Sequence, residues 1–179
     1  AILAGDALQA LSFEIISRDD LIISETKVKL LNLLSLSAFK MAEGQSIDLS
    51  IVSREVDIEL LNNMHKKKTG SLLNCSVMLG AILNPNISKK DLSILESFSS
   101  YIGLAYQVQD DVLDVTTSSE VLGKRQNSDS VKSKPSYPSI LGLDESVKKY
   151  ETLYQEALDE ISQLSVNEKP LRDLTIKLM

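Results

Sequence analysis

The stretch from Tyr101 to Val115 constrains the fold more than any other part of the sequence, because it has the pattern of a largely buried helix. At 3.6 residues per turn, its apolar side chains cover most of the circumference, and its polar positions fall within about a third of it. The polar strip consists of Gly103, Gln107, Asp110, Asp111 and Asp114. We therefore expect a core helix whose polar strip faces the inside of the protein.

The three aspartates of this strip occupy positions i, i+1 and i+4, in the last turns of the expected helix. They repel one another, and the helix macrodipole already places partial negative charge at this end. A hard divalent cation relieves that repulsion, and carboxylate oxygens without His or Cys suit Mg²⁺. An ordinary solvated acidic face is the alternative, and the apolar surroundings favour the metal site. Gly103 is expected to leave room above the acids.

Composition narrows the class of protein. The 179 residues, 43% hydrophobic and 25% charged, are enough for one globular domain over residues 1–179. A net charge of −6 argues against nucleic acid as the main partner. The lone Cys75 and single His65 allow neither an internal disulfide nor a structural zinc site, which fits the cytoplasm. No run reaches the length of a membrane span.

Helical periodicity extends along most of the chain, and no segment alternates as a strand does. Further helices are predicted over residues 2–17, 25–43, 72–83, 137–143 and 145–164, with a short one after Pro170. The sequence therefore predicts an all-α bundle. Gly44, just after the second helix, indicates close packing or space for a ligand. The polar segment 116–136, which contains Lys124 and Lys134, is interpreted as a functional loop, with a mobile linker as the alternative.

Six separated motifs occur in a fixed order: LAGDALQ at 3–9, GQxxDL at 44–49, KTG at 68–70, YQVQDDVLD at 106–114, LGKRQ at 122–126 and SYP at 136–138. Together they resemble the trans-prenyl diphosphate synthases, and most closely the bacterial farnesyl diphosphate synthases. The resemblance spans almost the whole chain. It implies an isoprenoid-synthase-type helical bundle around a central cavity.

The resemblance also implies roles for individual residues. The second aspartate-rich motif of the family corresponds to Asp110, Asp111 and Asp114, which would bind Mg²⁺, with Mn²⁺ as an alternative ion. The groups that contact the diphosphate or the developing carbocation correspond to Lys68, Thr69, Gln107 and Lys124. Further substrate-binding positions correspond to Gln45, Asp48, Tyr106 and Lys134, although the residues around Lys134 depart from the family's usual Gly-Lys-Ser/Thr-Thr.

The implied reaction joins isopentenyl diphosphate to an allylic diphosphate, dimethylallyl or geranyl, and makes farnesyl diphosphate in isoprenoid biosynthesis. Metal ions and lysines neutralise the leaving diphosphate, and the allylic cation then alkylates the second substrate. A cytoplasmic homodimer is expected. A geranylgeranyl or geranyl diphosphate synthase and a noncatalytic regulatory subunit of the same fold are the alternatives.

One departure from the family pattern concerns the start of the chain. The first aspartate-rich motif, the basic residues that bind isopentenyl diphosphate and the helices that carry them belong upstream of Ala1. The side chains that set product length belong there too. We therefore expect the chain by itself to be inactive.

Overall fold

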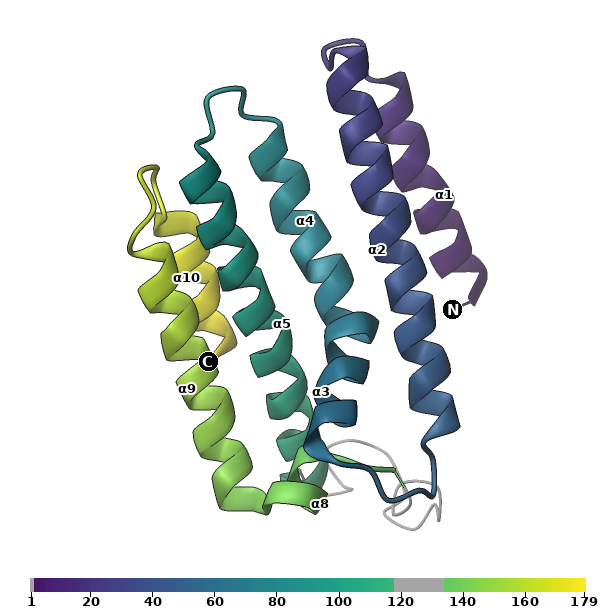
Figure 1. Ribbon diagram of the computed structural model, residues 1–179, viewed down its shortest axis with the longest axis vertical. Coiled ribbons are helices and arrows are strands. Elements are labelled where there is room, and N and C mark those ends of the chain that lie inside the picture. The colour runs from purple at the N-terminus through teal and green to yellow at the C-terminus, as the bar shows by residue number, and fades with distance from the viewer. Residues whose placement is uncertain (1, 118–133) are drawn as a thin grey trace.

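The computed structural model describes residues 2–117 and 134–179, and every element in these two ranges is a helix (Figure 1). This confirms the all-α prediction. The elements are α1 (Ile2–Arg18), α2 (Ser24–Ser50), α3 (Ile58–His65), the π-helical turn η1 (Lys66–Gly70), α4 (Ser71–Ile82), α5 (Lys89–Thr116), α8 (Tyr137–Leu141), α9 (Leu143–Ile161) and α10 (Lys169–Leu178). Within the described ranges, no helix is long and apolar enough to cross a membrane.

The long helix α5 lies at the centre of the arrangement, as its sequence pattern predicts. It packs against α4 on one side and along the length of α9 on the other (Figure 1). Helix α2 packs against α4 and η1, and α1 lies along α2. The short α8 contacts α3, α5 and α9 near the end of α5 that carries the aspartates.

The beginning of α5 is fixed by a cap that also holds a distant turn. The hydroxyl of Ser88 accepts a hydrogen bond from the backbone N–H of Asp91 (2.9 Å) and donates one to the Asp91 carboxylate (2.6 Å). The same carboxylate accepts hydrogen bonds from the backbone N–H (2.8 Å) and the hydroxyl (2.6 Å) of Ser165, between α9 and α10. Ser88 and Asp91 have the spacing of a helix cap in the sequence, whereas the sequence gives no sign of the link to Ser165, 74 positions from Asp91.

We expect Asp91 to make stability depend on pH. The hydrogen bonds from Ser165 and Ser88 lower the pKa of its carboxyl from 3.8 to about 2. A lowered folded-state pKa means that Asp91 stabilises the protein fully above about pH 5 and less as the pH falls towards 2. The Asp91→Asn variant should therefore melt several degrees below the wild type at neutral pH, and this difference should shrink in acid. Thermal unfolding from pH 7 to pH 3, with the exposed Glu156→Gln as control, tests this, and a constant difference contradicts it.

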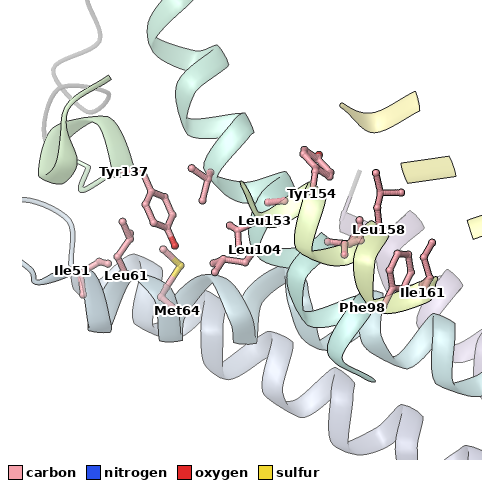
Figure 2. Packing of buried hydrophobic residues seen from close by; sticks show 14 residues of the cluster. Ile51, Leu61, Met64, Phe98, Leu104, Tyr137, Leu153, Tyr154, Leu158 and Ile161 are labelled. Carbon is pink, nitrogen blue, oxygen red and sulfur yellow. The ribbon is translucent and has the colours of Figure 1, made fainter. Parts of the chain in front are cut away.

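The hydrophobic core follows one side of α5 and is shown in Figure 2. Tyr137 and Met64 lie at one end of it and Phe98 and Ile161 at the other. The prediction of a buried helix is right for this side. It is wrong for the last turns, where the exposed fractions are 44% for Tyr106, 51% for Leu113 and 59% for Val115.

Two glycines allow helices to pack backbone against backbone. A Cβ at Gly44 would meet the backbone N of Lys68 and lie 2.7 Å from its Cα, so α2 touches η1 there. This confirms the close packing that the sequence indicates at Gly44. Helix α2 continues through Gly44 to Ser50, whereas the sequence predicted an end near Glu43. A Cβ at Gly103 would lie 2.9 Å from the Cα of Gly70. Gly103 therefore serves the contact of α5 with η1, and the expectation that it leaves room above the acids is wrong.

Candidate active site

A pocket of about 240 Å³ lies where the last turns of α5, the end of α3, η1 and the chain entering α8 come together. We call it the acidic pocket. It is lined by His65, Lys68, Gln107, Asp110, Asp111, Asp114, Val115, Lys134, Pro135 and Ser136. The three aspartates of the polar strip therefore share one space with two of the predicted lysines and with the predicted glutamine. The prediction that the strip faces inward is right for Gly103 and Gln107, which are buried, and for the half-buried Asp111. It is wrong for Asp110 and Asp114, which are exposed at the mouth of the pocket.

Asp111 connects α5 to the start of α8. Its carboxylate accepts a hydrogen bond from the backbone N–H of Tyr137 (2.9 Å). The Tyr137 hydroxyl in turn donates to the side-chain oxygen of Asn62 on α3. Burial, together with the negative charge of Asp111, raises the pKa of the Tyr137 hydroxyl, so this group stays a neutral donor. Helices α3, α5 and α8 thus hold one another around Asp111.

Asp48, on α2, holds the two lysines that reach the pocket. Its carboxylate lies 2.6 Å from the Nζ of Lys68 and 3.0 Å from the Nζ of Lys134. Burial by itself would raise the pKa of Asp48, but the hydrogen bonds and positive charges of the two lysines outweigh it and lower the pKa. A carboxylate repels a diphosphate. Asp48 can therefore support anion binding only indirectly, because it positions Lys68 and Lys134.

The π-helical turn η1 brings Lys68 to this position. Turns of this kind are rare and are found frequently at functional sites. Here the turn carries Lys68 and Thr69 between α3 and α4, with its backbone packed against Gly44. The contact at Gly44 brings the backbone of Lys68 against α2, the helix that carries Asp48.

Other predicted site residues lie elsewhere. Gln45, Thr69 and Tyr106 are not among the residues that line the acidic pocket. Gln45 and Thr69 are half-buried, and Tyr106 is exposed. Lys124 lies outside the described residues. The roles that the sequence gives to these four residues stay predictions.

Sequence reasoning missed His65 as a member of this site. Its side chain is 4% exposed, lines the acidic pocket and contacts Gln107. In the sequence it stands before three lysines and has no motif of its own. Its position as the last residue of α3, directly before the π-helical turn, is apparent only in the structure.

The donor set of the acidic pocket suits magnesium. Hard carboxylate oxygens from Asp110, Asp111 and Asp114 line it together, without a thiolate. Among the described residues, no three His, Cys, Asp or Glu side chains converge so as to hold a metal ion by themselves. In proteins, Mg²⁺ is usually bound by one or two carboxylates and completes its shell with water and substrate phosphates.

Comparison with known proteins places the chain in a family. Residues 1–169 match the family model described as Polyprenyl synthetase. The chain belongs to this family. The match confirms the resemblance that the ordered motifs indicate, and it covers both ranges that form the acidic pocket.

Three relatives illustrate the similarity. The farnesyl diphosphate synthase of Escherichia coli is 38% identical over 169 residues, which are 92% of this chain and 56% of the relative. The geranylgeranyl diphosphate synthase of Cyanophora paradoxa is 40% identical over 168 residues, which are 90% of this chain and 55% of the relative. A Helicobacter pylori geranyltransferase, solved with magnesium and isoprenyl diphosphate, superposes with a TM-score of 0.81 and 31% identity, over 99% of this chain and 58% of that one. The chain thus spans little more than half the length of these relatives.

Proposed function

We propose that the protein is a short-chain trans-prenyltransferase that condenses isopentenyl diphosphate with dimethylallyl or geranyl diphosphate to make farnesyl diphosphate. The acidic pocket carries this proposal, because it combines the carboxylates of α5 with Lys68 and Lys134. Carboxylates that hold a metal and cations that contact phosphate are both needed to bind a metal-bound diphosphate. The name of the Escherichia coli relative supports the farnesyl product.

In this proposal each side chain has a task. Asp110, Asp111 and Asp114 hold Mg²⁺, which supplies positive charge for the leaving diphosphate, and Mn²⁺ is the alternative ion. Lys68 and Lys134 bind its phosphate oxygens, and Lys124 is proposed as a third cation. Their charges favour departure of the diphosphate, because they stabilise the negative charge that develops on it.

The bond changes follow from that departure. When the allylic C–O bond breaks, its electron pair leaves with the diphosphate, and an allylic cation remains. The double bond of isopentenyl diphosphate attacks this cation, and the released diphosphate takes the proton that the new carbon skeleton loses as its double bond forms. Gln107, a buried neutral amide that lines the pocket, is proposed to lie beside the cation.

Geranylgeranyl diphosphate is the second candidate product. It is supported by the 40% identity to the Cyanophora paradoxa synthase, which is as high as the identity to the farnesyl synthase from Escherichia coli. Both products arise from the same chemistry at the acidic pocket and differ only in the number of condensations. The chain length of the product made from the same substrates distinguishes them.

We also infer a homodimer in the cytoplasm. The homodimer is inferred from the family to which the chain belongs. The only cysteine, Cys75, is buried and unpaired, which fits a reducing compartment. That residues 1–179 belong to one domain stays a prediction.

The test is an assay of the purified full-length protein. With isopentenyl diphosphate, dimethylallyl diphosphate and Mg²⁺, we expect farnesyl diphosphate as the main product by mass spectrometry. Chelation of the metal should abolish the reaction, and added Mg²⁺ should restore it. If the folded protein forms no prenyl diphosphate of any length with Mg²⁺ present, the proposal is wrong.

A further inference from the structure

His65 is held between two residues of the proposed active site. Its Nδ1 lies 2.9 Å from the outer amide atom of Gln107 assigned as Oε1, and its Nε2 lies 3.7 Å from Oδ2 of Asp111. The ring stacks on Tyr137 with centroids 5.6 Å apart and an angle of 17°. Its Nε2 is buried and makes no hydrogen bond to the described part of the chain. A ring fixed in this way can orient both of its neighbours.

For a neutral ring, the hydrogen bond to Gln107 has two chemical senses, because the outer oxygen and nitrogen of an amide are told apart by the hydrogen bonds that they make. In the first sense, Nδ1–H donates to the amide oxygen. A neutral ring then presents the bare lone pair of Nε2 to the carboxylate of Asp111. Two buried acceptors that face each other are unfavourable. The N–H₂ group of Gln107 then points towards the pocket, where positive charge develops in the proposed reaction.

In the second sense, the amide is turned by half a rotation. The N–H₂ of Gln107 donates to Nδ1, and the Nε2–H points towards Asp111. The carbonyl oxygen of Gln107 then faces the acidic pocket, where its negative end favours a developing cation. This arrangement removes the clash of acceptors and gives the amide a catalytic orientation.

We propose that His65, as the neutral tautomer with its proton on Nε2, is a positioning residue that holds the Gln107 carbonyl oxygen towards the reacting carbon. This inference rests on the proposed function. Because the carbonyl acts on charge that exists only in the transition state, loss of its orientation should lower kcat more than it changes KM.

Two substitutions of His65 separate its effect on the orientation of Gln107 from the packing of its ring on Tyr137. His65→Phe keeps an aromatic ring against Tyr137 but has no nitrogen to accept from Gln107. His65→Asn places an amide oxygen near the position of Nδ1, where it can accept that hydrogen bond. Asn63→Ala, an exposed position on the same helix, is the matched control.

We expect His65→Phe to lower kcat by about 10–100-fold, as removal of an orienting partner does at other sites, with little change in KM for either diphosphate. His65→Asn should recover most of kcat, and Asn63→Ala should match the wild type. Wild-type kcat in His65→Phe overturns the inference. So does an equal loss in His65→Asn and His65→Phe when both variants melt as the wild type does.

A spectroscopic measurement tests the same inference without catalysis. In the ¹⁵N-labelled full-length protein, the His65 ring nitrogens should show the Nε2–H tautomer. Their signals are assigned by their absence from the spectrum of His65→Asn. An Nδ1–H tautomer or an imidazolium overturns the inference. If the wild type makes no prenyl diphosphate, the proposed function fails, whereas the tautomer still decides how Gln107 is held.

Discussion

Replacing Asp110 and Asp114 together with asparagine should reduce kcat/KM by about 10²–10³-fold, the loss found when a group that stabilises transition-state charge is removed. Both carboxylates line the acidic pocket, and the neutral amide of asparagine lacks the negative charge that attracts and balances a hard cation. The wild type should also melt at a higher temperature when Mg²⁺ and inorganic diphosphate are added, because both bind the folded state. The double variant should lose most of that increase.

The stability of the unliganded protein should change in the opposite direction to activity. Asp114 is exposed and lies near the end of α5, where the macrodipole and Asp110 both oppose its charge. The single variant Asp114→Asn should therefore raise the free energy of unfolding by roughly 0.3–1 kcal/mol. Sites that bind charged substrates commonly sacrifice stability in this way.

The matched control is Asp144→Asn, the same change at the other end of a helix. Asp144 is exposed in the first turn of α9, where the macrodipole favours a carboxylate. Its replacement should lower stability by roughly 0.3–1 kcal/mol and leave the kinetics unchanged. Chemical denaturation and steady-state assays of both variants give the comparison. A destabilised Asp114→Asn would show that this carboxylate is structural, and unchanged kinetics of the double variant would remove the metal site from the proposal.

The sequence predicted the part of the site that lies on one element. Asp110, Asp111 and Asp114 share a strip of α5, and helical spacing alone brings them together. Lys68 and Lys134 came from the family resemblance, and the structure brings both to Asp48. No spacing rule predicts that contact, because α2, η1 and the segment before α8 meet only after the bundle has formed.

The errors and omissions have a common cause. The sequence predicted an end of the second helix near Glu43, whereas α2 continues through Gly44; the close packing that it also indicated at Gly44 is confirmed. The close approach of the Lys68 backbone makes any residue larger than glycine unfavourable at position 44. The expectation for Gly103 failed for the same reason, since Gly70 lies against it. His65 was missed because its partners are 42 or more positions away in the sequence. Local propensity describes an element, whereas contacts between elements decide these three positions.

Gly44→Ala should have the second large effect, on stability and on activity together. The added Cβ would meet the backbone N of Lys68 and lie 2.7 Å from its Cα and 2.8 Å from the carbonyl carbon of Lys67. Backbone atoms cannot turn aside as the end of a side chain can, so α2 and η1 must separate. Overpacking of this kind lowers the free energy of unfolding by about 1–3 kcal/mol. The shift also moves Lys68 relative to Asp48, and a displacement of 1 Å can reduce kcat about 10²-fold.

Gly80→Ala provides the control with the opposite sign. Gly80 lies within α4, and among the described residues a Cβ there would have no atom within 4 Å apart from its chain neighbours and the backbone of its own helix. The same substitution should therefore raise stability by up to about 1 kcal/mol, because alanine favours the helix over glycine. Its kinetics should equal those of the wild type. Denaturant unfolding of the two variants, with kcat measured in parallel, separates helix propensity from the contact between α2 and η1. If Gly44→Ala proves as stable as Gly80→Ala, the two helices do not touch at Gly44, and the position of Lys68 has another cause.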